Sequence, residues 1–145
     1  MLTCCTLAFF VMLRPMSIPT GAMENALLIE DQILVTNQPG REPGRRDIVV
    51  FQYPVDRRQT FIKRVVGLPG DRLRIVNKKL FVNDVAAVEP YAYHSTTYND
   101  SYRDNFPSEA NLKLYPGAED MLSQDATHAE VFVPGSKYFV MGQSR

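Results

Sequence analysis

Two features of this sequence could carry chemistry: a lysine in an apolar strand and a tight turn earlier in the chain. In the predicted strand Thr60–Val66, alternation puts Lys63 on the same face as Phe61 and Val65. Burial of an ammonium group favours its neutral form and lowers the pKa of the lysine, which can then act as a general base. The open alternative is that Lys63 lies at an edge, where its amine reaches water.

The turn Pro19-Thr20-Gly21-Ala22 has the form of a loop that presents a nucleophile. Thr20 carries a hydroxyl, but Ala22, at the tip, has no atom that can attack a carbonyl. The turn is therefore either a catalytic turn without its nucleophile or a plain turn. A turn bearing a hydroxyl, a buried lysine and an apolar segment together describe a serine–lysine hydrolase, in which the lysine takes the proton of the serine and a backbone N–H and a hydroxyl hold the oxyanion.

Length and composition indicate one mostly β domain. The chain has 145 residues, with 16 basic and 16 acidic side chains, so its formal charge is zero and nothing points to nucleic acid as a partner. Ten prolines and eight glycines among many Val, Ile, Phe and Tyr residues favour short strands joined by turns.

The elements expected to position the lysine and the turn are short strands. We predict strands at 16–18, 32–35, 47–53, 60–66, 72–76, 79–82, 130–133 and 137–141. Asn77-Lys78 is the expected turn of a hairpin, because asparagine tolerates a positive φ. Residues 89–130 have no regular pattern and are expected to form an irregular insertion on the surface.

The first 14 residues are expected to be a segment of their own. Leu2–Leu13 carries no charge, and as a helix its twelve residues would cover about 18 Å of a hydrocarbon core about 30 Å thick. Three interpretations stay open: part of a transmembrane helix, an interfacial anchor, or a buried first element of the fold. The first is favoured because nothing polar interrupts the run before Arg14.

The sequence gives no pattern for a metal or a disulfide framework. Cys4 and Cys5 are adjacent, and His94 and His128 are isolated from other ligand types. We therefore expect neither a metal nor another cofactor.

Four segments, in this order, resemble the motifs of type I signal peptidases: IPTGAMENALLIEDQILV, RRDIVVFQYP, FIKRVVGLPGDRL and VPGSKYFVMG. The resemblance runs from about Phe9 to Gly142, and IKRVVGLPGD is its most specific part. It implies a partly closed antiparallel barrel of coiled sheets over residues 15–145, behind an N-terminal membrane-proximal helix in residues 1–14.

The function implied by this resemblance is that of a single-pass membrane serine endopeptidase. Such an enzyme cleaves signal peptides from exported preproteins on the extracytoplasmic side, and it uses no cofactor. Its partners would be those signal peptides and membrane lipid, but no nucleic acid.

The resemblance also implies a role for individual residues. Ala22 takes the position of the nucleophilic serine, with its backbone N–H in the oxyanion hole. Thr20 completes that hole, and Lys63 is the general base. The residues implied to shape shallow pockets for small substrate side chains are Met16, Ile18 and Ile62.

Several positions depart from the family pattern. Ala22 removes the nucleophile, and removal of a catalytic serine costs about a million-fold in turnover. Glu30 and Arg46 stand where the pattern has glycine, and Ala26 where threonine is common. The segment GQSR replaces a Gly-Asp-Asn-Arg loop that is followed by a serine orienting the lysine, a role that Ser144 is not assigned. We therefore expect the chain as written to be inactive or impaired.

Two other functions stay open. The first is a non-catalytic binder that holds exported peptides in a groove without cutting them. The second is a self-cleaving repressor of the serine–lysine type, which is weakened by the absence of a helix-turn-helix pattern and by the apolar N-terminus.

Overall fold

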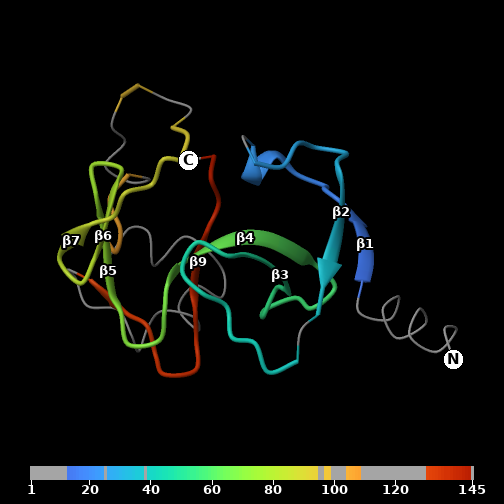
Figure 1. Cartoon of the computed structure of the whole chain (residues 1–145). Coiled ribbons are helices and arrows are strands. Elements are labelled where there is room, and N and C mark those ends of the chain that lie inside the picture. The colour runs from blue at the N-terminus through green and yellow to red at the C-terminus, as the bar shows by residue number, and fades with distance from the viewer. Residues whose placement is uncertain are drawn as a thin grey trace, which may run out of the picture.

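The computed structural model of the chain describes residues 13–24, 26–37, 39–94, 97–98, 104–108 and 130–144. Within these ranges the fold is built from short strands and a 3₁₀ turn, η1, at Gly21–Met23 (Figure 1). The strands are β1 Leu13–Ser17, β2 Gln32–Thr36, β3 Ile48–Gln52, β4 Thr60–Gly67, β5 Arg72–Val76, β6 Lys79–Val82, β7 Val85–Ala86, β8 Val131–Phe132 and β9 Phe139–Met141.

The strands form three antiparallel sheets, which confirms the mostly β, antiparallel fold. The sheets have the orders β1-β2, β3-β4-β9 and β7-β6-β5-β8. These are separate sheets and do not form one closed barrel; in Figure 1 the sheet with β4 lies between the other two. The N-terminal helix expected in residues 1–14 falls mostly outside the described residues, and Leu13 and Arg14 belong to β1. None of the described helical residues forms a segment able to cross a bilayer.

The hairpin of β5 and β6 has the limits that the sequence predicts. Its turn residues Asn77 and Lys78 have φ values of 48° and 70°, so both adopt the left-handed conformation that a two-residue I′ turn requires. The neighbouring strand β7 was not among the expected strands. It pairs with β6 across a second turn with positive φ at both positions, Asn83 and Asp84.

Three strands, one in each sheet, start after turns of the same construction. The residue before an aspartate has a positive φ, and Oδ2 of the aspartate accepts a hydrogen bond from the backbone N–H three residues earlier. The turns are Leu28–Asp31 before β2, Gly44–Asp47 before β3 and Leu68–Asp71 before β5, with N–Oδ2 distances of 2.9, 3.0 and 2.6 Å.

In each of these turns the residue before the aspartate has a left-handed backbone conformation, which explains why the family pattern has glycine there. The φ values are 72° at Glu30, 77° at Arg46 and 88° at Gly70. Glycine adopts this conformation without steric cost, whereas an L side chain is strained there. The two departures from the family pattern therefore place side chains at positions that favour glycine.

Asp71 stabilises the third of these turns from a buried position. It accepts hydrogen bonds from the Leu68 amide, from Asn83 Nδ2 at 2.8 Å and from Arg45 Nη2 at 2.8 Å. Burial raises the pKa of Asp71, but the three hydrogen bonds and the positive charge of Arg45 outweigh it, so the pKa lies below the ordinary value. Arg45 also donates to the Val66 carbonyl at 2.6 Å, which joins the turn to β4.

The hydrophobic core has two clusters. One contains Val66, Leu73, Leu80 and Val133 and lies between the sheets of β4 and β5. The other consists of Ile18, Met23 and Ile62, with Met16, Leu27, Ile33 and Val50 packed against it. The second cluster joins the β1-β2 hairpin and η1 to β4, and it therefore sets where the turn lies relative to the lysine strand.

Candidate active site

Lys63 lies in the middle of β4, opposite Val49 of β3, and its side chain is half-buried. Burial lowers the pKa of the Lys63 amine, because the charged form loses solvation. Nζ lies 5.9 Å from the centroid of the Phe61 ring, as the alternation of the strand predicts. The alternation of buried and exposed side chains ends two residues later. There the pairing with β9 shifts register between Val65 and Gly67, and Val65 and Val66 are both buried.

The turn and the lysine meet at Gly142, just after β9. A β-carbon built on Gly142 would lie 2.9 Å from the Ala22 carbonyl oxygen and 3.4 Å from Lys63 Nζ. The Ala22 carbonyl also accepts hydrogen bonds from the backbone N–H groups of Gln143 at 2.9 Å and Ser144 at 3.3 Å. The fold therefore brings position 22 close to the Lys63 amine, which the sequence predicts to be the general base.

Thr20 precedes η1 in an extended conformation, with φ −143° and ψ 151°, and is exposed. Its side chain makes no capping hydrogen bond to the 3₁₀ turn. The turn is closed instead by the bond from the Glu24 N–H to the Gly21 carbonyl, at 3.0 Å. The Thr20 hydroxyl is thus not used to cap the 3₁₀ turn. Its role in an oxyanion hole stays a prediction.

The three residues predicted to shape substrate pockets come together in the second core cluster. Ile18 is 2% exposed and Ile62 is 7% exposed, whereas Met16 is half-buried beside them. Of the three, Met16 has the most surface to offer a peptide. Ile18 and Ile62 present almost no surface, so their role in substrate pockets stays a prediction.

Strand edges near Lys63 are open within the described part of the chain. β1 pairs along one edge only, with β2. β9 covers β4 from Arg64 onward, through the pair Arg64–Met141, and leaves Thr60–Lys63 unpaired on that side. Unpaired backbone at strand edges is what an extended peptide needs in order to add as a further strand.

Two hollows of the surface lie elsewhere. One of about 330 Å³ is lined by Arg45, Arg46, Tyr91, Val66 of β4 and residues of β6, β7 and the segments next to them. Another, of about 360 Å³, lies around Arg41 and Asp47. Neither is lined by Ala22 or Lys63. Within the described residues, no group of three or more His, Cys, Asp or Glu side chains is placed to hold a metal ion.

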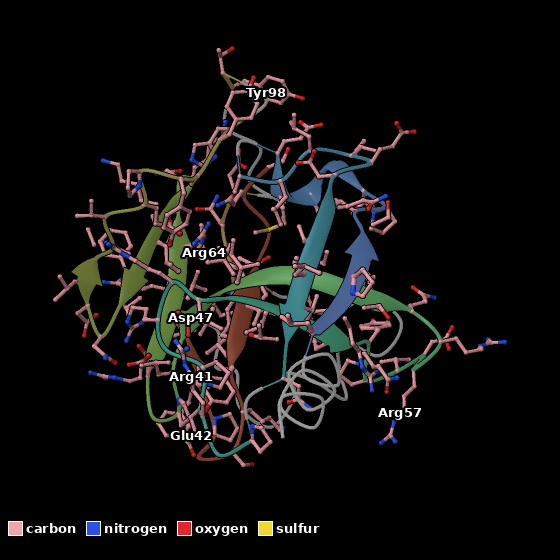
Figure 2. All side chains as sticks on the ribbon, turned by 45° about the vertical axis from the view of Figure 1, so that its right-hand side comes forward. Arg41, Glu42, Asp47, Arg57, Arg64 and Tyr98 are labelled. Atoms are coloured by element: carbon pink, nitrogen blue, oxygen red, sulfur yellow. The ribbon has the colours of Figure 1, made fainter. Side chains whose placement is uncertain are left out.

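Sequence reasoning missed two residues beside this site, Arg64 and Gln143. Gln143 is 1% exposed although it is polar, and Arg64 stacks on the Tyr91 ring with its Cζ 4.3 Å from the centroid. Figure 2 shows Arg64 near the centre of the view, whereas Arg57, at the β3–β4 turn, projects outward. The one available signal was a lone glutamine directly after the apolar strand Phe139–Met141.

Comparisons with known proteins agree with the resemblance in the sequence. Residues 1–145 match the family described as signal peptidase, peptidase S26. Signal peptidase I of Rickettsia akari is 28% identical over 166 residues, covering 93% of this chain and 62% of the relative, and that of Rickettsia canadensis is 29% identical with the same coverage. The chain thus spans about three-fifths of the length of these relatives.

A crystal structure of a signal peptidase I from Enterococcus faecalis is 26% identical to this chain, with a TM-score of 0.48, covering 71% of this chain and 78% of that structure. The match of the family along all 145 residues, together with the relatives, establishes the membership. The chain belongs to the signal peptidase, peptidase S26, family.

Proposed function

We propose that this chain carries the site of a signal peptidase I-type serine–lysine endopeptidase which, with alanine at position 22, holds extended signal peptides without cutting them. The observation that carries the proposal is the meeting of Ala22 and Lys63 at Gly142. In this proposal Lys63 is the base and the turn presents position 22, while the attacking oxygen and a partner that orients the Lys63 amine are missing.

The chemistry follows from the arrangement of these residues. In a form with serine at position 22, the neutral Lys63 amine would take the hydroxyl proton as the oxygen attacks the substrate carbonyl. The backbone N–H at position 22 and the Thr20 hydroxyl would hold the oxyanion. The lowered pKa of Lys63 supports the role of base, because a larger fraction of the amine is neutral near physiological pH.

The substrate would be an extended peptide that adds as a strand between the open edge of β1 and the unpaired part of β4. Its side chains next to the cut would be small, because Ile18 and Ile62 are nearly covered and leave little surface for a larger side chain to contact. Signal peptides have small residues at these positions. This proposal includes the 15–145 catalytic domain as a partly closed barrel, and residues 1–14 as the membrane anchor that holds it on the extracytoplasmic side.

The test compares binding and cleavage of two peptides by the chain as it is. One peptide carries alanine at the first and third positions before the cut, and the control carries tryptophan at both. We expect the alanine peptide to bind at least about ten-fold more tightly, a difference of about 1.4 kcal/mol, with no product by mass spectrometry. Equal affinity for the two peptides, or no binding of either, would refute the proposed function.

A further inference from the structure

Gln143 contacts the 3₁₀ turn η1, strand β4 and the segment at Tyr93. Its backbone N–H donates to the Ala22 carbonyl at 2.9 Å, and its carbonyl accepts from the Tyr93 N–H at 2.9 Å. We assign the orientation of its side-chain amide from these neighbours: only with the nitrogen toward the Met23 carbonyl, at 3.2 Å, do both amide atoms find a partner. The amide oxygen then accepts from Arg64, including Nε at 3.1 Å.

We propose that Gln143 is a positioning residue, which fixes the turn of Ala22 against the strand of Lys63 by bridging the Met23 carbonyl and the Arg64 guanidinium. This role deepens the proposed function, because it accounts for how position 22 is held over the amine. Gln143 itself touches neither Nζ nor a substrate, and acts through the turn.

The bridge needs the chemistry of an amide. The Met23 carbonyl is an acceptor and requires a donor, whereas the Arg64 guanidinium is a donor and requires an acceptor. The glutamine amide offers both, on two atoms bonded to the same carbon. An ionised carboxylate would keep the contact with Arg64 but would set oxygen against oxygen at Met23.

Burial makes the bridge matter. Gln143 is 1% exposed, so a lost partner is not replaced by water and the amide would be left unsatisfied. Arg64 is held from two further sides: Nη1 donates to the Arg46 carbonyl at 2.7 Å, and the guanidinium stacks on the Tyr91 ring. The bridge therefore anchors the turn to a side chain that is itself fixed.

The consequence for Lys63 follows from the close approach at Gly142. A β-carbon built on Gly142 would lie 2.9 Å from the Ala22 carbonyl oxygen and 3.4 Å from Nζ, so the turn and Gly142 both lie near the half-buried amine. If the bridge is removed, the turn keeps the two backbone hydrogen bonds at the Ala22 carbonyl, but we expect it to shift relative to Gly142 so that more water reaches Nζ. The amine then regains solvation and titrates nearer its ordinary pKa.

The experiment is an NMR titration of the Lys63 side chain in the full chain and in Gln143→Met. Methionine fills a similar volume without a donor or a strong acceptor, and Gln32→Met, at an exposed glutamine of β2, is the matched control. We expect Gln143→Met to raise the pKa of Lys63 by at least about half a unit, and the control to leave it unchanged. Lys63→Met assigns the resonance.

A merely structural role is distinguished by the urea midpoint, recorded for the same samples. If Gln143→Met lowers the midpoint but leaves the titration of Lys63 in the folded protein unmoved, the positioning role is overturned. If that variant does not fold, Arg64→Lys tests the positioning role instead, because it removes the guanidinium end of the bridge and keeps the positive charge. It should raise the pKa of Lys63 in the same direction, and an unchanged value would overturn the role.

The titration requires no peptide, so its failure and the failure of the proposed function can be told apart. A raised Lys63 pKa in Gln143→Met with no selective peptide binding by the parent chain would keep the positioning role and reject the function. Selective peptide binding by the parent chain with an unchanged Lys63 pKa in Gln143→Met would keep the proposed function and reject the positioning role.

Discussion

Replacement of Gly142 with alanine measures how closely the Ala22 turn approaches β9. The added methyl group would lie 2.9 Å from the Ala22 carbonyl oxygen, closer than carbon and oxygen normally approach, and 3.4 Å from Lys63 Nζ. The obstructing atom belongs to the backbone and cannot rotate away. Overpacking of this kind costs about 1–3 kcal/mol. For a small domain this corresponds to a urea midpoint roughly 1 M lower.

Gly135 gives the matched control. It lies in the turn between β8 and β9, no atom lies within 4 Å of its added β-carbon, and its φ is outside the left-handed range. Gly135→Ala should leave the free energy of unfolding unchanged or raise it by up to about 1 kcal/mol, because alanine restricts the unfolded chain. Urea unfolding followed by circular dichroism measures both variants. If Gly142→Ala is no more destabilising than Gly135→Ala, the close approach of the turn, and with it the assembled site, is refuted.

Four further outcomes are expected. Ala22→Ser should cleave the alanine peptide at least about 100-fold more slowly than the relatives do, because within the described residues no hydrogen bond orients Lys63 Nζ and a misplaced group costs about that factor; cleavage at the rate of the relatives would count against this. Because burial lowers the pKa of Lys63, the unfolded chain binds more protons, so the free energy of unfolding should rise with pH in the window below about 10.4; urea titrations of Lys63→Met should lose this rise, and an unaltered rise would contradict the burial. Asp71→Ala should lower the free energy of unfolding by about 2–3 kcal/mol in urea. Since the pKa of Asp71 is lowered in the folded protein, the ionised carboxylate's contribution should be full above about pH 3.9 and be lost as pH falls below that value through the lowered pKa; a loss that persists in stronger acid would speak against the hydrogen bonds as its source. Glu30→Gly should stabilise the fold by about 0.5–1 kcal/mol and raise its thermal midpoint, because glycine adopts the positive φ of this position without strain; a lower midpoint would contradict this.

Local structure could be predicted from the sequence where neighbouring residues determine it. The hairpin around Asn77 and the limits of β5 and β6 follow from strand patterns and a two-residue turn. Lys63 could be placed beside Phe61 because alternation along a strand needs no knowledge of the rest of the fold. Glu30 and Arg46 stand where the family pattern has glycine, and the structure adds the reason, because both have a positive φ.

Long-range contacts could not be predicted. The bulge of β4 between Val65 and Gly67 depends on how β9 packs against it, and no local pattern marks it. Gln143 pairs with Arg64 across two strands that are distant in the sequence, so its burial and its partners depend on the assembled fold. The same holds for the meeting of Ala22 and Lys63, which the resemblance to a family suggested and composition did not.

The repeated aspartate turns differ in how far the loss of each carboxylate should spread. Leu28–Asp31, Gly44–Asp47 and Leu68–Asp71 each precede the first residue of one strand, and the three strands belong to three different sheets. Loss of the Asp31 carboxylate should therefore loosen the β1-β2 sheet and leave the other two protected from hydrogen exchange. Loss of the Asp71 carboxylate should affect two sheets at once, because Asp71 also binds Arg45, which lies in the turn before β3.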